Sequence, residues 1–189
     1  MKLAGVLPYA RSLLQSSVEP GDIVVDATAG NGHDTLFLAN LVGETGTVIS
    51  CDIQAEAIRA TKNRIEAAGL ESRVSLFNQG HQSLNTISLF NKAPIKAAIF
   101  NLGYLPKGDK SITTNGNTTI LAIEQLLERI VPKGLIILVI YHGHPEGKVE
   151  KDEVMSYLQT IPQEEAHIAS YGFINQRNAP PFVVAIEKR

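Results

Sequence analysis

A short run near the N-terminus combines an acidic residue with two glycines. It has the sequence Asp-Ala-Thr-Ala-Gly-Asn-Gly-His-Asp-Thr over residues 26–35, and it begins where the apolar stretch 22–27 ends. Glycine lets the backbone turn sharply and approach a ligand closely, and a helix that starts here offers free N–H groups to a polar or anionic group. A plain turn between a strand and a helix would use the same glycines, but it gives no reason for Asp26.

A second acidic residue, Asp52, lies at the end of another apolar stretch, 47–52. It follows the glycine run by about 20 residues, a spacing at which a carboxylate commonly accepts hydrogen bonds from ribose hydroxyls. Asp52 could instead cap the helix expected to start near Gln54. The glycine run and Asp52 together are more specific than either feature alone, and they predict a ligand that contains a nucleoside.

The residue types narrow the choice of nucleoside ligand. A dinucleotide fingerprint has Gly or Ala where this chain has Thr35. A phosphate-binding P-loop is excluded because no Gly-Lys-Ser/Thr follows the glycines. S-adenosylmethionine is the remaining common choice. Two alternatives stay open: an NAD-dependent oxidoreductase that uses the same loop, and a non-catalytic module that binds a nucleoside.

Polar residues also follow a later apolar stretch, in the run Asn101-Leu102-Gly103-Tyr104. The amide oxygen of Asn101, with nearby backbone carbonyls, can accept the hydrogens of an amine and aim the nitrogen lone pair at an electrophilic methyl group. Asn101 could also be a plain buried residue at a strand end. Tyr104 can pack on a planar base. A long polar loop follows, of a length that is often functional, although it could simply be solvated. From this loop we expect substrate contacts by Lys107, Lys110, Ser111, Thr113 and Thr114.

Two histidines, His142 and His144, follow the most apolar stretch of the chain. An imidazole titrates near neutrality, so one of them could accept the proton that an attacking ammonium must lose, with Glu146 holding the ring. A metal site is not predicted because no third ligand is spaced nearby and methyl transfer needs no metal. We expect Tyr141 to contact the substrate and Arg177 to contact a phosphate.

These residues need strands and helices that bring them together, and the sequence alternates between the two. The predicted strands are 22–27, 47–52, 73–78, 96–101, 135–141, 166–171 and 182–187. The predicted helices are 35–41, 54–68, 82–89, 118–131 and 148–159, preceded by a helical segment over 3–16 that Pro8 interrupts. This alternation predicts βαβ crossovers and a mostly parallel sheet, and the last two strands predict an antiparallel hairpin. Ligands bind beyond the carboxyl ends of such strands, where the candidate residues lie.

Length and composition limit the possible classes of protein. The chain has 189 residues, 44% hydrophobic and 19% charged, which predicts one domain over 1–189 with an N-terminal helical segment over 1–18. No stretch is long enough for a membrane span or a signal peptide, and Cys51 is the single cysteine, so we expect a cytoplasmic protein. The net charge of −2 argues against coating nucleic acid by bulk electrostatics. It allows one RNA loop nucleotide to enter a pocket.

The glycine run resembles the first motif of class I methyltransferases, with Thr28 in place of the first glycine. Longer strings resemble one family of that class, the ribosomal-RNA methylases; they are DATAGNGHDT, FNLGYLPKGDKSITTN, VIYHGHPEG and YGFINQRNAPPFVVAIEK. The resemblance covers essentially the whole chain. It implies an α/β, Rossmann-like class I methyltransferase fold with S-adenosyl-L-methionine as cofactor. The sheet would have seven mostly parallel strands with an antiparallel last strand and helices on both faces.

The resemblance also implies roles for individual residues. Gly30, Asn31 and Gly32 would contact the methionine and ribose parts of the cofactor, with Asp26 beneath the methionine ammonium. Asp52 and Gln54 would hold the ribose and the adenine edge. The other residues assigned to the cofactor are Thr28, His33, Asp34, Thr35, Gln79, Gly80, His81 and Asn101. His81, the expected adenine contact, could instead cap the helix that starts at Gln82.

The implied reaction is N-methylation of a modified RNA base. Asn101 to Tyr104 is similar to the Asn/Asp-Pro-Pro-Tyr/Phe motif of enzymes that methylate amino nitrogens, with Leu102 and Gly103 replacing the prolines. The family resemblance implies conversion of 5-aminomethyl-2-thiouridine to 5-methylaminomethyl-2-thiouridine at the wobble position of tRNA, in the anticodon loop. Ribosomal RNA and protein amines stay open as alternative acceptors. A homodimer is compatible with the sequence, because the segment 1–18 could cover the sheet or a partner.

Overall fold

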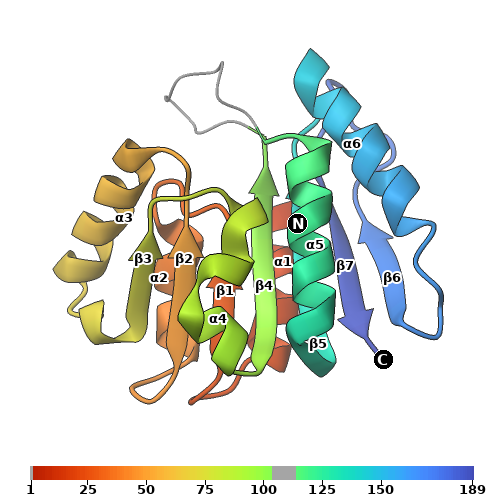
Figure 1. The fold of residues 1–189 in the computed structure, drawn as a ribbon. Helices are drawn as coiled ribbons and strands as arrows, with labels where there is room; N and C mark the ends of the chain where they lie inside the picture. The colour runs from red at the N-terminus through yellow and green to blue at the C-terminus, as the bar shows by residue number, and fades with distance from the viewer. Residues whose placement is uncertain (1, 104–113) are drawn as a thin grey trace.

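A sheet of seven strands forms the centre of the computed structural model, which describes residues 2–103 and 114–189 (Figure 1). The strands are β1 (Ile23–Asp26), β2 (Thr47–Cys51), β3 (Val74–Phe77), β4 (Ile95–Leu102), β5 (Ile130–Ile140), β6 (Ala166–Tyr171) and β7 (Phe182–Lys188). Their order is β3-β2-β1-β4-β5-β7-β6, and β7 alone runs antiparallel to its neighbours. The predicted fold class and its closing hairpin are confirmed.

Helices cover both faces of this sheet. The α-helices are α1 (Val6–Ser17), α2 (His33–Leu41), α3 (Ala55–Ala67), α4 (Ser88–Lys92), α5 (Gly116–Arg129) and α6 (Pro145–Leu158), and two short 3₁₀ helices are η1 (Glu71–Arg73) and η2 (His81–Thr86). In Figure 1, α4 and α5 lie in front of the sheet, and α1 and α2 lie behind it. The central strands of the sheet are therefore shielded from solvent on both faces, while the edge strands β3 and β6 are only partly buried.

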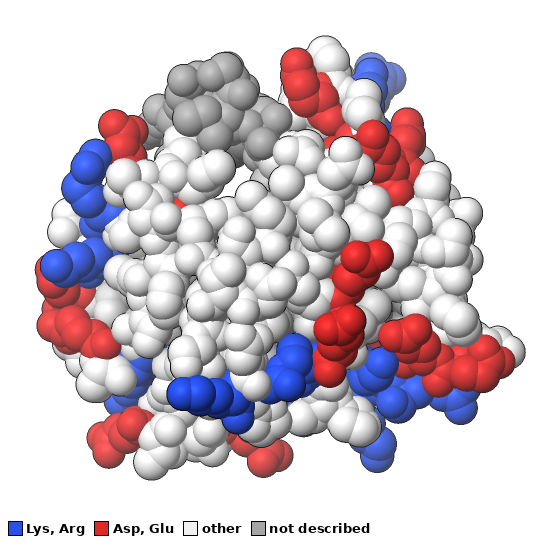
Figure 2. Space-filling view, in the orientation of Figure 1, with Lys and Arg blue, Asp and Glu red and all other residues white. Residues whose placement is uncertain are grey.

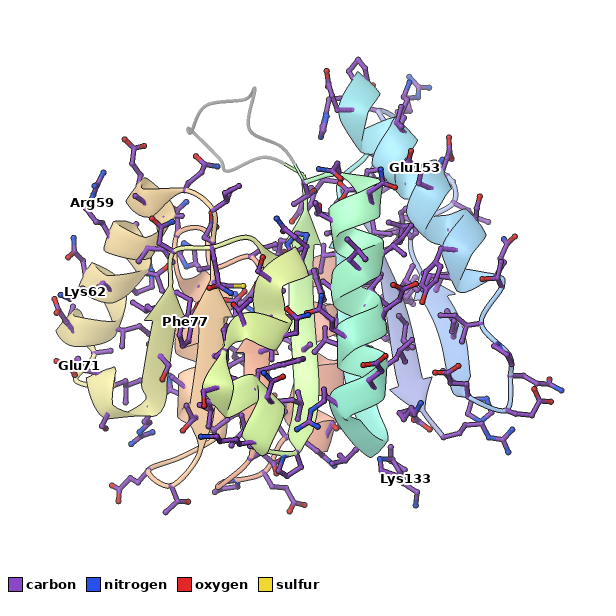
Figure 3. All side chains as sticks on the ribbon, in the orientation of Figure 1. Arg59, Lys62, Glu71, Phe77, Lys133 and Glu153 are labelled. Atoms are coloured by element: carbon purple, nitrogen blue, oxygen red, sulfur yellow. The ribbon has the colours of Figure 1, made fainter. Side chains whose placement is uncertain are left out.

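The central strands are continuously apolar because both of their faces are buried. Successive side chains of a strand point to opposite faces of the sheet. On β4, Phe100 packs in the cluster beneath α4, α5 and α6, while Ile99 packs in the cluster beneath α1 and α2. Both side chains are fully buried. A parallel sheet covered on both sides produces such continuously apolar strands. The helix α3, in contrast, has an exposed face, and Figure 3 shows its Arg59 and Lys62 extending outward.

The N-terminal helix α1 packs directly on the sheet. Ala10 and Leu14 are fully buried there. The ring of Tyr9 stacks on Tyr171 of β6 with centroids 4.0 Å apart. Pro8 was expected to interrupt this segment, but it lies in the first turn of α1. The first four N–H groups of a helix have no acceptor within the helix, so a proline there removes no hydrogen bond.

Several predicted boundaries differ from the structure, including those of α6, of β5 and of the helix predicted over 82–89. α6 begins at Pro145 rather than residue 148, because the His144 side chain caps it by accepting the Gly147 N–H at 3.0 Å. β5 begins at Ile130 rather than residue 135, and its register with β4 shifts near that start. The helix predicted over 82–89 is split into η2 and α4 around Ile87, which has extended backbone angles.

None of the described helices is long and apolar enough to cross a membrane. The single-domain organisation over 1–189 and the cytoplasmic location stay predictions.

Candidate active site

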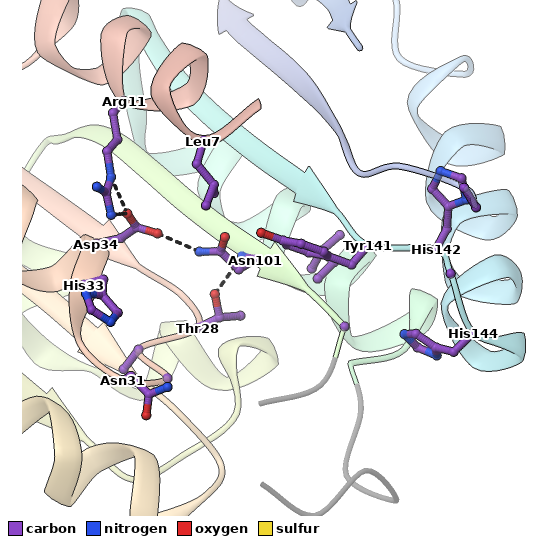
Figure 4. Close-up of a pocket in the computed structure, with 16 residues that line it drawn as sticks. Leu7, Arg11, Thr28, Asn31, His33, Asp34, Asn101, Tyr141, His142 and His144 are labelled. Carbon is purple, nitrogen blue, oxygen red and sulfur yellow. Dashed lines mark hydrogen bonds and ion pairs between the residues drawn. The ribbon is translucent and has the colours of Figure 1, made fainter. Parts of the chain in front are cut away.

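A cavity of about 1010 Å³ lies at the carboxyl ends of β1, β4 and β5 (Figure 4). Its walls come from α1, from the loop between β1 and α2, from the end of β4 and from the segment between β5 and α6. Small-molecule sites in proteins commonly occupy roughly 300–1,000 Å³. The cavity therefore has room for a nucleoside cofactor together with part of a second molecule.

The glycine run forms a tight loop that α3 holds in place. Gly32 has a φ of +76°, and a Cβ atom on it would lie 2.8 Å from the Cα atom of Thr61. The Thr61 hydroxyl donates to the Gly30 carbonyl at 3.2 Å, and the Arg64 Nε donates to the Asn31 carbonyl at 2.7 Å. A side chain at position 32 would meet both steric crowding and unfavourable backbone angles. The close approach of α3 therefore requires glycine there.

Asp26 lies fully buried beneath this loop. Its carboxyl group accepts hydrogen bonds from the Thr35 hydroxyl at 2.6 Å and from the Thr28 backbone N–H at 3.2 Å. Burial, and then the negative charge of Asp34, raise the pKa of Asp26 to about 7. Because the donors that hold it are neutral, this carboxyl group suits a positively charged ligand group placed above it.

Asp52 closes the glycine loop and also holds the turn that precedes α3, whose N-cap residue is Gln54. Its Oδ2 accepts the Gly30 N–H at 2.9 Å, and its Oδ1 accepts the Gln54 N–H at 2.9 Å. Burial raises the pKa of Asp52, while these two hydrogen bonds oppose that rise. Each carboxylate oxygen has two lone pairs, so the group keeps acceptor capacity for ribose hydroxyls.

Asn101 at the end of β4 is held from two sides. Its backbone N–H donates to the Thr28 hydroxyl at 2.7 Å, and its side-chain Nδ2 donates to Asp34 Oδ2 at 2.8 Å. Arg11 of α1 binds the other Asp34 oxygen through Nε at 2.9 Å and Nη2 at 2.7 Å. Figure 4 shows this chain of contacts along one wall of the cavity. Three distant parts of the sequence thus converge on one amide group.

Tyr141, His142 and His144 form the opposite wall. In Figure 4 the Tyr141 ring extends toward Asn101. Burial and the negative charge of Asp34 raise the pKa of Tyr141, so its hydroxyl stays protonated. The His144 Nδ1 accepts the Gly147 N–H and lies 3.4 Å from Glu146 Oε2, while the His142 ring packs edge-on against Phe182. Glu146 is thus placed beside a histidine, as the sequence suggested.

Comparison with known proteins assigns this chain to a family. Residues 48–187 match the family model described as "Putative rRNA methylase". The chain belongs to this family.

Relatives of the rRNA methylase family support the same assignment. A chloroplastic tRNA (mnm(5)s(2)U34)-methyltransferase of Arabidopsis thaliana is 35% identical over 187 residues, which are 95% of this chain and 68% of that protein. A crystal structure of a "putative rRNA-methylase" from Clostridium thermocellum is 42% identical, with a TM-score of 0.96 and full coverage of both chains. A crystal structure of "a putative methyltransferase" from Streptococcus mutans in complex with SAH is 35% identical, with a TM-score of 0.90 and 99% coverage of both chains.

Family membership confirms the predicted enzyme class and cofactor. The chain is an S-adenosylmethionine-dependent RNA methyltransferase. The site fits this cofactor, because the loop at Gly32 leaves no space for a side chain and the cavity beside it exceeds the size of one nucleoside. Among the described residues, no group of three or more His, Cys, Asp or Glu could hold a metal ion.

This rRNA methylase family member has Thr28 where class I methyltransferases usually have a first glycine, and the structure gives a reason. The Thr28 hydroxyl accepts the backbone N–H of Asn101, so it ties the glycine loop to the end of β4. A glycine could not make this contact. The threonine therefore fixes the distance between the cofactor loop and the candidate catalytic amide.

Most of the predicted site residues line the cavity or support its walls. Those that line it are Thr28, Gly30, Asn31, His33, Asp34, Asn101, Tyr141, His142 and His144. Asp26, Gly32 and Thr35 are buried beneath the loop, and Asp52 and Gln54 lie behind it. Thr114 pairs with Gly103, and Arg177 is exposed on the loop that brings Ala179 to the cavity. The predictions for Tyr104, Lys107, Lys110, Ser111 and Thr113 lie outside the described residues.

Gln79, Gly80 and His81 are not among the lining residues of the cavity. His81 is buried, its Nδ1 donates to the Ala27 carbonyl at 3.3 Å, and its Nε2 lies 3.5 Å from the Thr119 hydroxyl. Burial lowers the pKa of His81 to about 4, so the ring is neutral. Gln79 donates to the Ser83 carbonyl at 2.8 Å. These contacts are structural, and the adenine contact stays a prediction.

Sequence reasoning missed the contribution of α1 to the cavity. Leu7 and Arg11 both line it, and Arg11 makes the ion pair with Asp34. Neither residue belongs to a motif, and the helix lies before the first strand in the sequence. An arginine within an otherwise largely apolar helix was the one available signal.

Proposed function

We propose that this methyltransferase converts the primary amine of 5-aminomethyl-2-thiouridine, at the wobble position of tRNA, to the methylamine. The observation that carries the proposal is the orientation of the Asn101 amide. Its Nδ2 donates to Asp34, so its Oδ1 is left to accept a hydrogen bond from a molecule in the cavity. The tRNA (mnm(5)s(2)U34)-methyltransferase of Arabidopsis, 35% identical over 95% of this chain, supports this choice of acceptor.

The cofactor in this proposal lies against the glycine loop. Asn31 and the N-terminus of α2 face its methionine and ribose parts, Asp26 lies beneath its ammonium group, and Asp52 holds its ribose. S-adenosylmethionine supplies a methyl group bonded to a positively charged sulfur, which makes the methyl carbon electrophilic. A loop with the carboxyl group of Asp26 at its start and that of Asp52 against Gly30 suits a ligand of net positive charge.

Asn101 then positions the acceptor amine. Its Oδ1 accepts one amine N–H, which aims the nitrogen lone pair at the methyl carbon along the line of the C–S bond. The nitrogen forms the new N–C bond as the C–S bond breaks, and the sulfur keeps the electron pair. The product nitrogen must also lose a proton. Positioning in a dry cavity is the main contribution of the protein, because the positive charge on sulfur disperses in the transition state.

His142 is the better candidate for the group that accepts this proton. The Nδ1 lone pair of His144 is occupied by the N–H of Gly147, so a neutral His144 carries its proton on Nε2. Protonating His144 at Nδ1 would break the cap of α6. The His142 ring, held against Phe182 at the cavity wall, has no such constraint from a helix cap.

The RNA is bound through local contacts in this proposal. Figure 2 shows one face on which Lys and Arg are scattered among Asp and Glu, with an uncharged centre. Such a face does not favour a long electrostatic track for RNA. We propose that one anticodon-loop nucleotide enters the cavity while Lys148, Lys151 and Arg177 contact nearby phosphates. The rim of a second subunit in a homodimer would extend this surface.

A methyl-incorporation assay tests the acceptor. Purified protein is incubated with methyl-labelled S-adenosylmethionine and, separately, with tRNA, ribosomal RNA and total protein from cells that lack this methyltransferase. We expect label in tRNA alone, and nucleoside mass spectrometry should identify it in 5-methylaminomethyl-2-thiouridine. Label in ribosomal RNA or protein, with none in tRNA, would reject the tRNA acceptor. No label in any pool would favour a module that binds the cofactor without transfer.

The substitution Asn101→Ala tests the role of the amide. It removes the acceptor oxygen while the loop contacts of Asp26 and Asp52 remain. We expect kcat to fall on the order of 100-fold, as for other oriented polar groups in active sites, with S-adenosylhomocysteine affinity nearly unchanged. Calorimetry and initial rates measure the two quantities. Normal turnover by this variant would show that Asn101 does not position the amine.

A further inference from the structure

We propose that Arg11 and Asp34 are positioning residues that fix which end of the Asn101 amide faces the cavity. This proposal deepens the amine-methylation function and rests on it. It reassigns Asp34, which the sequence placed among the cofactor contacts. It also makes α1, outside the methyltransferase motifs, part of the reaction centre.

The geometry of the three residues forms a continuous chain. Arg11 donates twice to Asp34 Oδ1, at 2.9 and 2.7 Å, and Asn101 Nδ2 donates to Asp34 Oδ2 at 2.8 Å. The Asp34 side chain is 10% exposed and the Arg11 side chain 37%. The guanidinium also lies over the Phe37 ring, 5.3 Å from its centroid. Arg11 is thus held by α2 from two directions, which limits the positions that Asp34 can adopt.

The chemistry of these groups decides the orientation of the amide. A guanidinium can only donate hydrogen bonds, and a carboxylate can only accept them. Asp34 therefore accepts from Arg11 on one side and requires a donor on the other. Asn101 can satisfy it only by turning its NH₂ toward Asp34, so its carbonyl oxygen is the atom left for the cavity. A cavity with an acceptor at this point favours substrates with N–H groups over those with only acceptors.

The substitution Asp34→Asn reverses this orientation. Arg11 would take the oxygen of the new amide, so the NH₂ of residue 34 would face Asn101. Asn101 would then turn its oxygen toward residue 34 and present its NH₂ to the amine. We expect kcat to fall on the order of 100-fold. The affinity for S-adenosylhomocysteine should change by less than about 3-fold, because the hydrogen bonds that hold Asp26 and Asp52 do not involve residue 34.

A second substitution in the same chain should restore the acceptor. In the double variant D34N/N101D, residue 101 would accept the NH₂ of residue 34 with one oxygen and offer the other to the cavity. We expect its kcat to recover to within about 10-fold of the original enzyme, a strong positive coupling between the two sites. Asn101→Asp alone would place two carboxylates together, so it should be less active than the double variant. A double variant no better than Asp34→Asn would overturn the proposal.

NMR of the Asn101 side-chain amide tests this proposal independently of whether tRNA is the methyl acceptor. The side-chain NH₂ resonances of ¹⁵N-labelled protein report the hydrogen bonding of Asn101 without any substrate. We expect them to be shifted by the carboxylate in the original protein and to move to solvent-like positions in Asp34→Asn. Unchanged resonances would overturn the proposal even if the enzyme methylates tRNA. The rates are measured on whichever RNA pool accepts methyl groups, so a different acceptor would correct the function alone.

Arg11→Met tests the first member of the chain. It keeps the apolar stem of the side chain but removes both donors to Asp34, and we expect kcat to fall about 10-fold with little change in cofactor affinity. Lys188→Met is the matched control, because it removes a partly buried ion pair with Glu165 near the amino end of β5, away from the cavity. It should keep full activity. Equal losses in both variants would show a general stability effect and overturn the role of Arg11.

Discussion

The acidic residues of this site differ in what holds them, and the differences predict different behaviour. Asp34 is paired with a cation, Asp52 with backbone N–H groups, and Asp26 with a hydroxyl and one N–H. These different surroundings change the pKa values of two of the three residues. Burial raises the pKa of Asp26 to about 7, whereas at Asp52 burial also raises the pKa but two backbone hydrogen bonds oppose the increase. Similar side chains near one cavity thus have separate tasks.

Asp52→Ala should weaken cofactor binding through two losses. The Gly30 N–H loses its acceptor, so the loop is less well ordered, and the ribose loses its expected partner. Hydrogen bonds to charged groups contribute roughly 1.5–3 kcal/mol each, so we expect the Kd for S-adenosylhomocysteine to rise at least about 10-fold. Calorimetry measures the change. An unaltered Kd would exclude the ribose contact.

Asp26 should make the stability of the cofactor-free protein depend on pH. Its pKa is raised from 3.8 to about 7 in the folded state, so the folded protein holds a proton that the unfolded chain releases. Stability from this group is therefore complete below about pH 4 and is lost as pH rises through 7. The variant Asp26→Asn has no carboxyl group to titrate, so it lacks this loss. Urea unfolding at pH 5 and pH 8 should show a smaller decrease in stability for the variant than for the original protein.

At the scale of elements, two helices from outside the glycine run determine its shape. The helix α3 packs against the loop at Gly32, and α1 contacts the site through the ion pair between Arg11 and Asp34. The loop is therefore rigid because of its neighbours, and substitutions on those helices should affect the site without touching a ligand.

Gly32→Ala should destabilise the protein as well as the cofactor site. The new Cβ would lie 2.8 Å from the Thr61 Cα atom, and the residue would keep a φ of +76°. Strain of this kind costs on the order of 1–3 kcal/mol, so we expect a lower melting temperature. Gly69→Ala is a matched comparison, since it has a φ of +67° but nothing within 4 Å of its Cβ position. An equal loss in both variants would show that backbone angles, rather than α3, set the cost.

The sequence predicted the elements better than the contacts between them. Apolar stretches located the described strands, and in the central ones burial on both faces leaves a pattern within a few neighbouring residues. The start of β5 was missed because Ile130 pairs with Ile95 of β4 but the next paired residue is Leu135, and the irregular segment between them has Lys133 at a φ of +64°. The partners of Asp34 were missed because they lie 23 and 67 residues away. Local patterns carry no information about such pairs.

For the whole molecule, the balance of charge limits how RNA is held. The net charge is −2, and Figure 2 shows acidic and basic residues intermixed on one face. Recognition must then depend on the nucleotide in the cavity and on a few nearby cations. This agrees with a chain whose described part has its cavity at one edge of a single sheet.

Binding of tRNA should therefore depend weakly on salt. Each neutralised phosphate of a single strand, such as an anticodon loop, contributes about −0.7 to the slope of log K against log salt, so two or three contacts predict a slope of about −1.4 to −2.1. Filter binding measured between about 50 and 200 mM salt gives this slope. A slope near −10, typical of extended phosphate tracks, would contradict recognition by a single nucleotide.

The position of β4 between β1 and β5 also orders events during synthesis of the chain. The glycine run and Asp52 are translated first, whereas Asn101 joins them only when β4 enters the sheet beside β1. The glycine loop itself depends on β4, because the Thr28 hydroxyl accepts the Asn101 N–H and the Ala27 N–H donates to the Ile99 carbonyl. The loop and the amide therefore reach their final positions together, so cofactor binding should report a completed sheet rather than the glycine run alone.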